Sequence, residues 1–114
     1  MEEKVTRPWG TYQAIYMDKT YQVKRITVNP GGQLSLQSHN QRAEHWIIVQ
    51  GEGTVVCGDQ NFVLKKGDHV HIPIKAKHRM SNFGKEEIVF IEVQNGDYLG
   101  EDDIIRYEDI YGRN

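Results

Sequence analysis

The sequence predicts an all-β domain, built as a sandwich or a closed barrel of short antiparallel strands. Seven short runs rich in β-branched and aromatic residues follow one another at close intervals. Clusters of Gly, Asn, Asp and Pro separate many of these runs and are typical of turns. No internal stretch carries a sustained apolar repeat at helical spacing. Together these observations favour strands along most of the chain.

The expected strands differ in length and composition. Residues 11–17 and 20–28 contain Tyr, Ile, Val and Thr, and residues 44–50 follow with Trp and three aliphatic side chains. The shorter ranges 54–56, 62–64 and 68–72 depend on Val, Phe, Leu and Ile, and residues 87–93 form the most apolar run. The acidic tail, residues 100–111, has interspersed apolar residues and fits either a final strand or a short helix packed on the barrel.

Composition limits the kind of protein. The chain has 114 residues and a mass of 13.2 kDa, so we expect one domain over residues 1–114, with a core at about 20–95 and the two terminal segments packed on it. A net charge of −2 without a basic stripe argues against nucleic acid as a partner. No apolar run approaches the ~20 residues that span a bilayer, so we expect no membrane segment. A single cysteine, Cys57, fits a reducing cytoplasm.

The run from Ile88 to Val93 is apolar on both faces. Side chains alternate along a strand, so Ile88 and Phe90 face one side while Val89, Ile91 and Val93 face the other. A barrel buries one face of each strand, and the second apolar face then needs another cover. A partner subunit would supply it and the terminal segments are the alternative; we expect a homodimer.

Residues 31–46 and 73–78 hold a group of side chains with metal-ligand chemistry. Gln37 and His39 are two apart and share a face if the chain is extended, and Glu44 follows after a short polar bend. His78 lies in a third segment. One amide oxygen, two imidazoles and one carboxylate would suit Zn²⁺ or another divalent ion. Taken singly, each residue also fits an ordinary place at the surface or a strand end.

The joint spacing of these residues resembles the two motifs of the cupin family. The first motif, G(x)5HxH(x)3–4E(x)6G, matches with Gln in place of the first His at Gly31, Gln37, His39, Glu44 and Gly51. The second motif, G(x)5PxG(x)2H(x)3N, matches at Gly67, Pro73, His78 and Asn82, while Lys75 replaces the inner Gly. The resemblance implies the cupin double-stranded β-helix (jelly-roll) barrel.

A narrower resemblance covers residues 7 to 113. The sequence is similar to the phosphomannose isomerase domain of bifunctional mannose-1-phosphate guanylyltransferase/mannose-6-phosphate isomerases, through segments that include Arg7-Pro8-Trp9-Gly10, Leu34-Ser35-Leu36-Gln37-Ser38-His39, Arg42-Ala43-Glu44-His45-Trp46 and Tyr98-Leu99-Gly100-Glu101-Asp102-Asp103-Ile104. It implies that Gln37, His39, Glu44 and His78 are the metal ligands. Nothing in the chain resembles the Gly-rich nucleotide-binding loop of the guanylyltransferase half, so we expect no guanylyl transfer.

The resemblance also implies an activity. It points to a metal-dependent isomerase that interconverts mannose 6-phosphate and fructose 6-phosphate through an enediol. Zn is the expected metal, with Co, Mn, Fe and Ni as alternatives. A cupin that binds a sugar phosphate without turning it over is the alternative function. An iron-dependent oxygenase is a third, weakened because a neutral amide replaces an imidazole.

Several charged residues are candidates for contact with a sugar phosphate. Arg42 is the expected catalytic residue, because its guanidinium would suit phosphate binding or an oxyanion. Lys24 and Arg106 are further candidates for binding the substrate phosphate. Glu92 lies on an otherwise apolar strand and is either a proton carrier or a structural acceptor. The pair His69 and His71 is a competing metal site, but no third ligand stands at an obvious offset.

Overall fold

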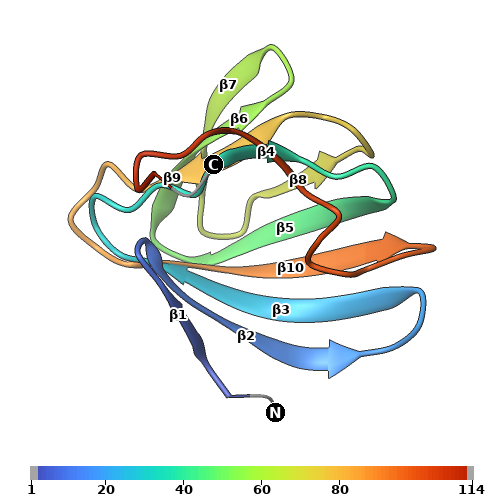
Figure 1. Ribbon diagram of the computed structural model, residues 1–114. Coiled ribbons are helices and arrows are strands. Elements are labelled where there is room, and N and C mark those ends of the chain that lie inside the picture. The colour runs from blue at the N-terminus through green and yellow to red at the C-terminus, as the bar shows by residue number, and fades with distance from the viewer. Residues whose placement is uncertain (1–2, 113–114) are drawn as a thin grey trace.

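The computed structural model describes residues 3–112 and contains two antiparallel sheets that pack face to face (Figure 1). The first sheet has six strands in the order β1-β2-β3-β10-β5-β8, which cover Val5–Arg7, Gly10–Met17, Tyr21–Val28, Ile88–Gly96, Arg42–Gln50 and His69–Ile72. The second has five in the order β11-β4-β9-β6-β7, which cover Ile105–Glu108, Leu36–Ser38, His78–Ser81, Glu52–Cys57 and Gln60–Lys65. The all-β prediction is confirmed.

Each expected strand is present, and four further strands appear, of which only the one in the tail was among the alternatives expected from the sequence. These four are β1, β4, β9 and β11, of three or four residues each. They are too short and too polar to show the alternation of a strand, and tertiary pairing creates them: β4 lies between β11 and β9. The tail therefore contains a strand, and the alternative of a short helix is wrong.

The inward face of the large sheet is divided into an apolar half and a polar half. Along β10, Ile88 and Phe90 lie in the core, while Glu92 and Gln94 continue the same buried row. Strands β3 and β5 repeat this order, with Ile26 and Val28, and Trp46 and Ile48, as their core residues. The apolar half packs against β6, β9 and the loop before β4 through Val55, Met80 and Leu34. The polar half has no such packing and borders a cavity.

The outward face of the large sheet carries apolar side chains that the chain covers only in part. Val89, Ile91 and Val93 are half-buried, and Ile47 and Val49 on β5 are exposed. The described terminal segments extend the sheets at β1 and β11 rather than lying across this face. The homodimer stays a prediction. No helix within residues 3–112 is long and apolar enough to cross a membrane.

Lys75 replaces the motif glycine and adopts the backbone conformation of a glycine. Its φ is 71°, like the φ of 81°, 80° and 92° at the motif glycines Gly31, Gly51 and Gly67. A residue with a Cβ is strained in this left-handed region. The conformation directs the Lys75 amide to donate to the carbonyl oxygen of His39 at 2.7 Å. The second motif is thereby joined to the first at a candidate ligand.

We predict that Lys75→Gly stabilises the fold. Glycine keeps the hydrogen bond to His39 and removes the left-handed strain, and the net gain in the free energy of unfolding should be about 0.5–1 kcal/mol. Urea denaturation measures it. Lys66→Gly is the control, since Lys66 is a turn lysine without a positive φ and the change there should be neutral or destabilising. A loss of stability in Lys75→Gly would contradict the assignment of strain.

Candidate metal centre

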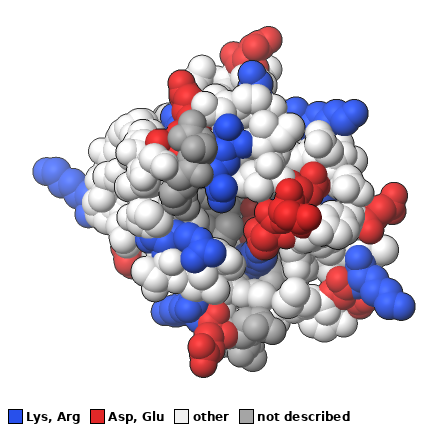
Figure 2. Space-filling model, in the orientation of Figure 1, with Lys and Arg blue, Asp and Glu red and all other residues white. Residues whose placement is uncertain are grey.

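A cavity of about 160 Å³ lies between the polar half of the large sheet and the strands β4, β9 and β11. Its lining includes the four predicted metal ligands and the three predicted substrate-binding residues: Gln37, His39, Glu44, His78, Lys24, Arg42 and Arg106. The structure thus brings together residues from five strands and a loop. Figure 2 shows basic and acidic side chains around a recess on the face seen in Figure 1.

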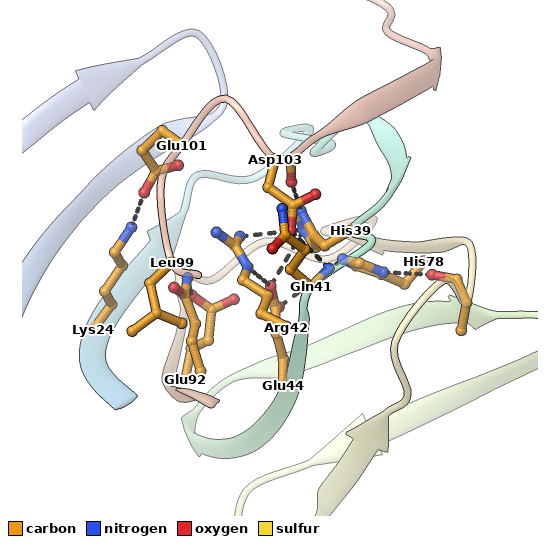
Figure 3. A network of polar contacts seen from close by, with 12 residues as sticks. Lys24, His39, Gln41, Arg42, Glu44, His78, Glu92, Leu99, Glu101 and Asp103 are labelled. Carbon is orange, nitrogen blue, oxygen red and sulfur yellow. Dashed lines mark hydrogen bonds and ion pairs between the residues drawn. The ribbon is translucent and has the colours of Figure 1, made fainter. Parts of the chain in front are cut away.

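His39, Glu44 and His78 form the centre of the cavity. All three are buried, and one ligand atom from each lies within 4.8 Å of the others. Glu44 Oε2 is 3.3 Å from His39 Nε2, and Glu44 Oε1 is 3.9 Å from His78 Nε2. Figure 3 shows the three side chains converging from the loop after β4 and from β5 and β9. Such a convergence of two imidazoles and a carboxylate is the chemistry of a divalent metal site.

Hydrogen bonds to the backbone orient both imidazoles. His39 Nδ1 lies 2.6 Å from the carbonyl oxygen of Asp103, and His78 Nδ1 lies 3.0 Å from that of Ala76. A carbonyl oxygen only accepts, so each Nδ1 carries the proton and each Nε2 presents a lone pair to the cavity. Burial lowers the pKa of His39 to about 4, with the Arg42 charge as a second cause, and burial also lowers the pKa of His78. Both rings are therefore neutral at pH 7, the form that binds metal.

Gln37 joins the centre from β4. It is the cross-strand partner of His78 on β9 and of Arg106 on β11, so the three side chains share one face of the small sheet. Gln37 and Arg106 both line the cavity, the first half-buried and the second exposed. The amide of Gln37 is thus placed beside the imidazole of His78, where a fourth ligand would stand.

Arg42 lies in the centre itself. Its Nε donates to Glu44 Oε2 at 3.0 Å, and its Nη2 donates to the bare Nε2 of His39 at 3.2 Å. The guanidinium is buried, and its Nη1 is the buried side-chain polar atom within residues 3–112 that lacks a hydrogen-bond partner. Buried donors are normally satisfied, so this one points to a ligand with an acceptor atom. The strand expected from the sequence begins at Glu44, two residues after Arg42; in the structure Arg42 is the first residue of β5.

A second carboxyl group lies behind Glu44. The Trp46 indole Nε1 donates to Glu44 Oε1 at 2.9 Å and to Glu92 Oε1 at 3.2 Å, and Gln94 Nε2 donates to Glu92 Oε2 at 2.8 Å. Burial, and then the negative charge of Glu44, raise the pKa of Glu92 to about 8. Glu92 is therefore mostly protonated at neutral pH in the metal-free protein. The hydrogen bonds from Trp46 and Gln94 make Glu92 a structural acceptor; its role as a proton carrier stays a prediction.

Lys24 faces the cavity, and its neighbour Arg25 points to the outer face. Lys24 is buried, and its ammonium group pairs with Glu101 of the tail. Sequence reasoning did not assign roles to Arg7, Tyr12, Glu101 or Asp103, although each lines the cavity or contacts a residue that does. Arg7, Glu101 and Asp103 lie inside segments that resemble the family, and this resemblance was the signal that could have pointed to them. Their contacts span up to 77 positions in sequence.

His69 and His71 are not part of this centre. Both are exposed on β8, where His71 is the cross-strand partner of His45 and stacks on it with ring centroids 4.5 Å apart. Glu44 and Trp46 flank His45 and point inward, so these histidines lie on the outward face of the sheet. The competing metal site is separated from the cavity by the sheet itself.

The residues of the cavity fit a divalent cation. The lone pairs of His39 Nε2 and the Glu44 carboxylate converge on one place, and the cationic guanidinium of Arg42 now contacts both. A positive group already stabilises these acceptors, so a metal ion would meet the same complementary charge. His39, Glu44 and His78 would hold the ion, Gln37 is the neighbouring fourth donor, and Arg42 would have to yield its contact with His39 Nε2.

We predict an opposite pH dependence for Glu92 and His39 in metal-free protein. Glu92 binds its proton more tightly when folded, with a pKa of about 8 against 4.5, so the stability it confers is lost as the pH rises through 8. His39, at about 4 against 6.5, adds stability that is lost as the pH falls through 4. Above pH 6.5, the ionisation of Glu92 still changes the stability with pH, whereas that of His39 no longer does. Wild type should therefore become less stable as the pH rises from 6.5 to 8.

Glu92→Gln tests this directly. The amide of this variant cannot ionise. The free energy of unfolding of the variant, measured by urea denaturation after metal removal, should therefore vary less between pH 6.5 and 8 than that of wild type. Glu52→Gln, a change at an exposed glutamate, should keep the wild-type slope. Equal slopes in wild type and Glu92→Gln would show that Glu92 is ionised in the fold.

Comparison with known proteins gives the family. The model of the mannose-6-phosphate isomerase C-terminal family matches residues 1–109. The alginate biosynthesis protein AlgA of Pseudomonas aeruginosa is 54% identical over 110 residues, 96% of this chain and 23% of that protein. A mannose-1-phosphate guanylyltransferase of Salmonella montevideo is 50% identical over 111 residues, 97% of this chain and 24% of that protein. The chain spans about a quarter of the length of these relatives.

Solved structures give the fold. A cupin-2 domain protein from Rhodospirillum rubrum, Rru_A2000, superposes with a TM-score of 0.70 at 26% identity, over 82% of this chain and 67% of that one. The predicted jelly-roll barrel is confirmed by this similarity together with the two-sheet topology. The metal-ligand geometry, the barrel and the match over almost the whole sequence agree: the chain belongs to the mannose-6-phosphate isomerase C-terminal family of cupin domains.

Proposed function

We propose that the protein is a metal-dependent aldose–ketose isomerase that interconverts mannose 6-phosphate and fructose 6-phosphate through an enediol. The observation that carries the proposal is the buried set of His39, Glu44 and His78, with both imidazole lone pairs facing one cavity. Family membership supplies the substrate class. The guanylyltransferase activity in a relative's name concerns a protein about four times as long, and we propose no guanylyl transfer here.

The reaction moves a proton between C1 and C2 of the sugar, and negative charge develops on the neighbouring oxygens. A bound divalent ion, which we propose to be zinc, supplies Lewis-acid stabilisation of that charge. Arg42 supplies a second positive group beside it, with Nη1 buried and free to donate to a developing oxyanion. Such a donor acts most strongly in a buried site, where it is fixed before charge appears.

Glu92 is the group that we propose carries the proton. It lines the cavity, it is fully enclosed, and it is not needed as a metal ligand. The indole of Trp46 and the amide of Gln94 hold its two oxygens in place, so the carboxyl group is oriented before the substrate arrives. Burial and the charge of Glu44 raise the pKa of Glu92 to about 8, so both of its forms are populated near neutral pH. The ionised carboxylate would accept the proton from one carbon of the substrate, and the carboxyl group so formed would return it to the neighbouring carbon.

The phosphate group would lie at the mouth of the cavity. Lys24 reaches it from β3 and Arg106 from β11, on opposite sheets. The two cations lie at the mouth of the cavity, and the carboxyl groups of Glu44 and Glu92 lie at its base with the candidate metal ligands. This arrangement suits a ligand whose anionic end remains near solvent. The alternative, a cupin that binds sugar phosphates without turnover, would use the same cavity, and only an assay of the reaction separates the two.

We predict that His39→Ala abolishes both metal binding and isomerase activity. Wild-type protein should carry about one divalent ion per chain, and the variant should bind it at least ~100-fold more weakly, because one imidazole ligand is lost. Metal analysis and a coupled assay of fructose 6-phosphate formation on the same sample measure both effects. A metal-loaded wild type without turnover would favour the binding function.

The matched control is His71→Ala. This histidine is exposed on the outward face, and the same substitution there should leave metal content and turnover at wild-type values. If His71→Ala loses the ion and His39→Ala keeps it, the ligand assignment is wrong.

A further inference from the structure

The mouth of the cavity contains more positive charge than the reaction centre uses. Lys24 Nζ lies 4.7 Å from the ring centroid of Tyr12, and Arg7 Cζ lies 5.3 Å from the same centroid. Arg7 Nη2 also donates to the Tyr12 hydroxyl at 3.3 Å. The register explains the cluster: Ala14 pairs with Lys24, so Tyr12, two residues earlier, shares the inward face of the sheet. One aromatic ring thus holds two cations at the rim.

The tail places a carboxylate on this cluster. Glu101 is exposed, yet it pairs with Lys24, whose side chain is only 8% exposed. It is the one carboxylate within residues 3–112 that forms a salt bridge with Lys24. In Figure 3 this pair stands apart from the group of His39, Arg42 and Glu44. An exposed carboxylate that neutralises a buried ammonium occupies the position in which an anionic ligand would be stabilised.

The Lys24–Glu101 pair also separates two cavities. A second cavity of about 320 Å³ lies on its other side, and Tyr12, Lys24 and Glu101 line both. The reaction cavity, about 160 Å³, is smaller than the ~300 Å³ at which ordinary small-molecule sites begin. Glu101 is the exposed member of the residues that the two cavities share.

The rest of the tail is anchored on both sides of Glu101. The Gln22 amide donates to the Leu99 carbonyl at 3.4 Å, and the Asp103 carboxylate accepts from the backbone amides of Asn40 and Gln41 at 3.0 and 2.9 Å. Asp103 is buried, whereas Glu101 is exposed. The segment is therefore held in place while the carboxylate between its anchors can turn away.

We propose that Arg7 and Tyr12 join Lys24 and Arg106 in the phosphate subsite, and that Glu101 is an internal counter-ion which the substrate phosphate displaces. The inference rests on the proposed function for the identity of the ligand, a sugar phosphate. We call Glu101 in this role the latch. It neutralises the buried Lys24 when no anionic ligand is bound. It also disfavours the binding of neutral sugars, because a neutral sugar cannot replace its charge.

The test measures the binding of inorganic phosphate by calorimetry to metal-free protein of residues 1–114, so that phosphate bound by a metal does not contribute. Glu101→Gln should bind phosphate roughly three- to tenfold more tightly than wild type, because its competitor is gone. Glu108→Gln is the matched control: it removes a tail carboxylate of similar exposure that pairs with Arg79 and not with Lys24. It should bind as wild type does.

Two further variants test the cations. Arg7→Gln should weaken phosphate binding several-fold, and because Arg7 is exposed the change does not threaten folding. Lys24→Gln should weaken it more, with the melting temperature recorded to confirm that the variant folds. Equal affinities of Glu101→Gln and Glu108→Gln, or phosphate binding that neither Arg7 nor Lys24 affects, would overturn the latch. So would the absence of phosphate binding in every variant.

The outcomes separate this inference from the proposed function. Phosphate binding in the expected order without turnover of mannose 6-phosphate would support the latch and contradict the isomerase. Turnover with no effect of Glu101→Gln on phosphate binding would support the isomerase and overturn the latch.

Discussion

The buried carboxylate of Glu44 is the constraint on which the polar half of the barrel depends. It is 1% exposed, and an ionised carboxylate removed from water is unstable unless charges and donors surround it. Arg42, Trp46 and His39 all approach it within 3.3 Å. These contacts fix the rotamers of the candidate ligands, and they explain why a guanidinium is buried at the start of β5. The charge of Glu44 thus arranges the side chains of the candidate metal centre.

The apolar half of the barrel is joined to this arrangement through one buried side chain. Trp46 belongs to both halves: its ring packs on Phe90, with centroids 5.0 Å apart, while its indole N–H bridges Glu44 and Glu92. Along β5 every second side chain faces inward, which is the ordinary period of a strand. This single inward row contains both site residues and core residues. The tail completes the structure from the other side, because Asp103 orients His39. Loss of the contacts that the tail makes should therefore disturb the candidate metal centre, although none of the candidate metal ligands is changed.

Much of the fold followed from local pattern, and the candidate ligands followed from motif spacing. The seven expected strands are those with enough β-branched residues to show alternation, whereas β4 and β9, which carry or adjoin the ligands, are too short to do so. Gln37, His39, Glu44 and His78 could be named in advance because their spacing resembles the two cupin motifs, and the family resemblance implied their role as ligands. Arg7, Tyr12 and Glu101 could not be given a role, because they meet only through the register of β1, β2 and β3 and the return of the tail.

The exposed histidines show the converse. His69 and His71 form a His-x-His pair in sequence, yet β8 places both on the outward face with His45. A spacing of two residues states only that side chains share a face, and the sheet decides which face that is. Lys75 gives the same lesson for the backbone: a motif glycine can be replaced while its positive φ is retained.

The central claim is that the cavity of His39, Glu44 and His78 is the metal site of this chain. Anomalous diffraction at the zinc edge, from crystals of protein loaded with zinc, tests it most directly. We expect one strong peak at ~2.0–2.2 Å from His39 Nε2, His78 Nε2 and a Glu44 oxygen, with Arg42 withdrawn from His39. A cavity without a peak, and a peak instead between His45 and His71, would contradict it.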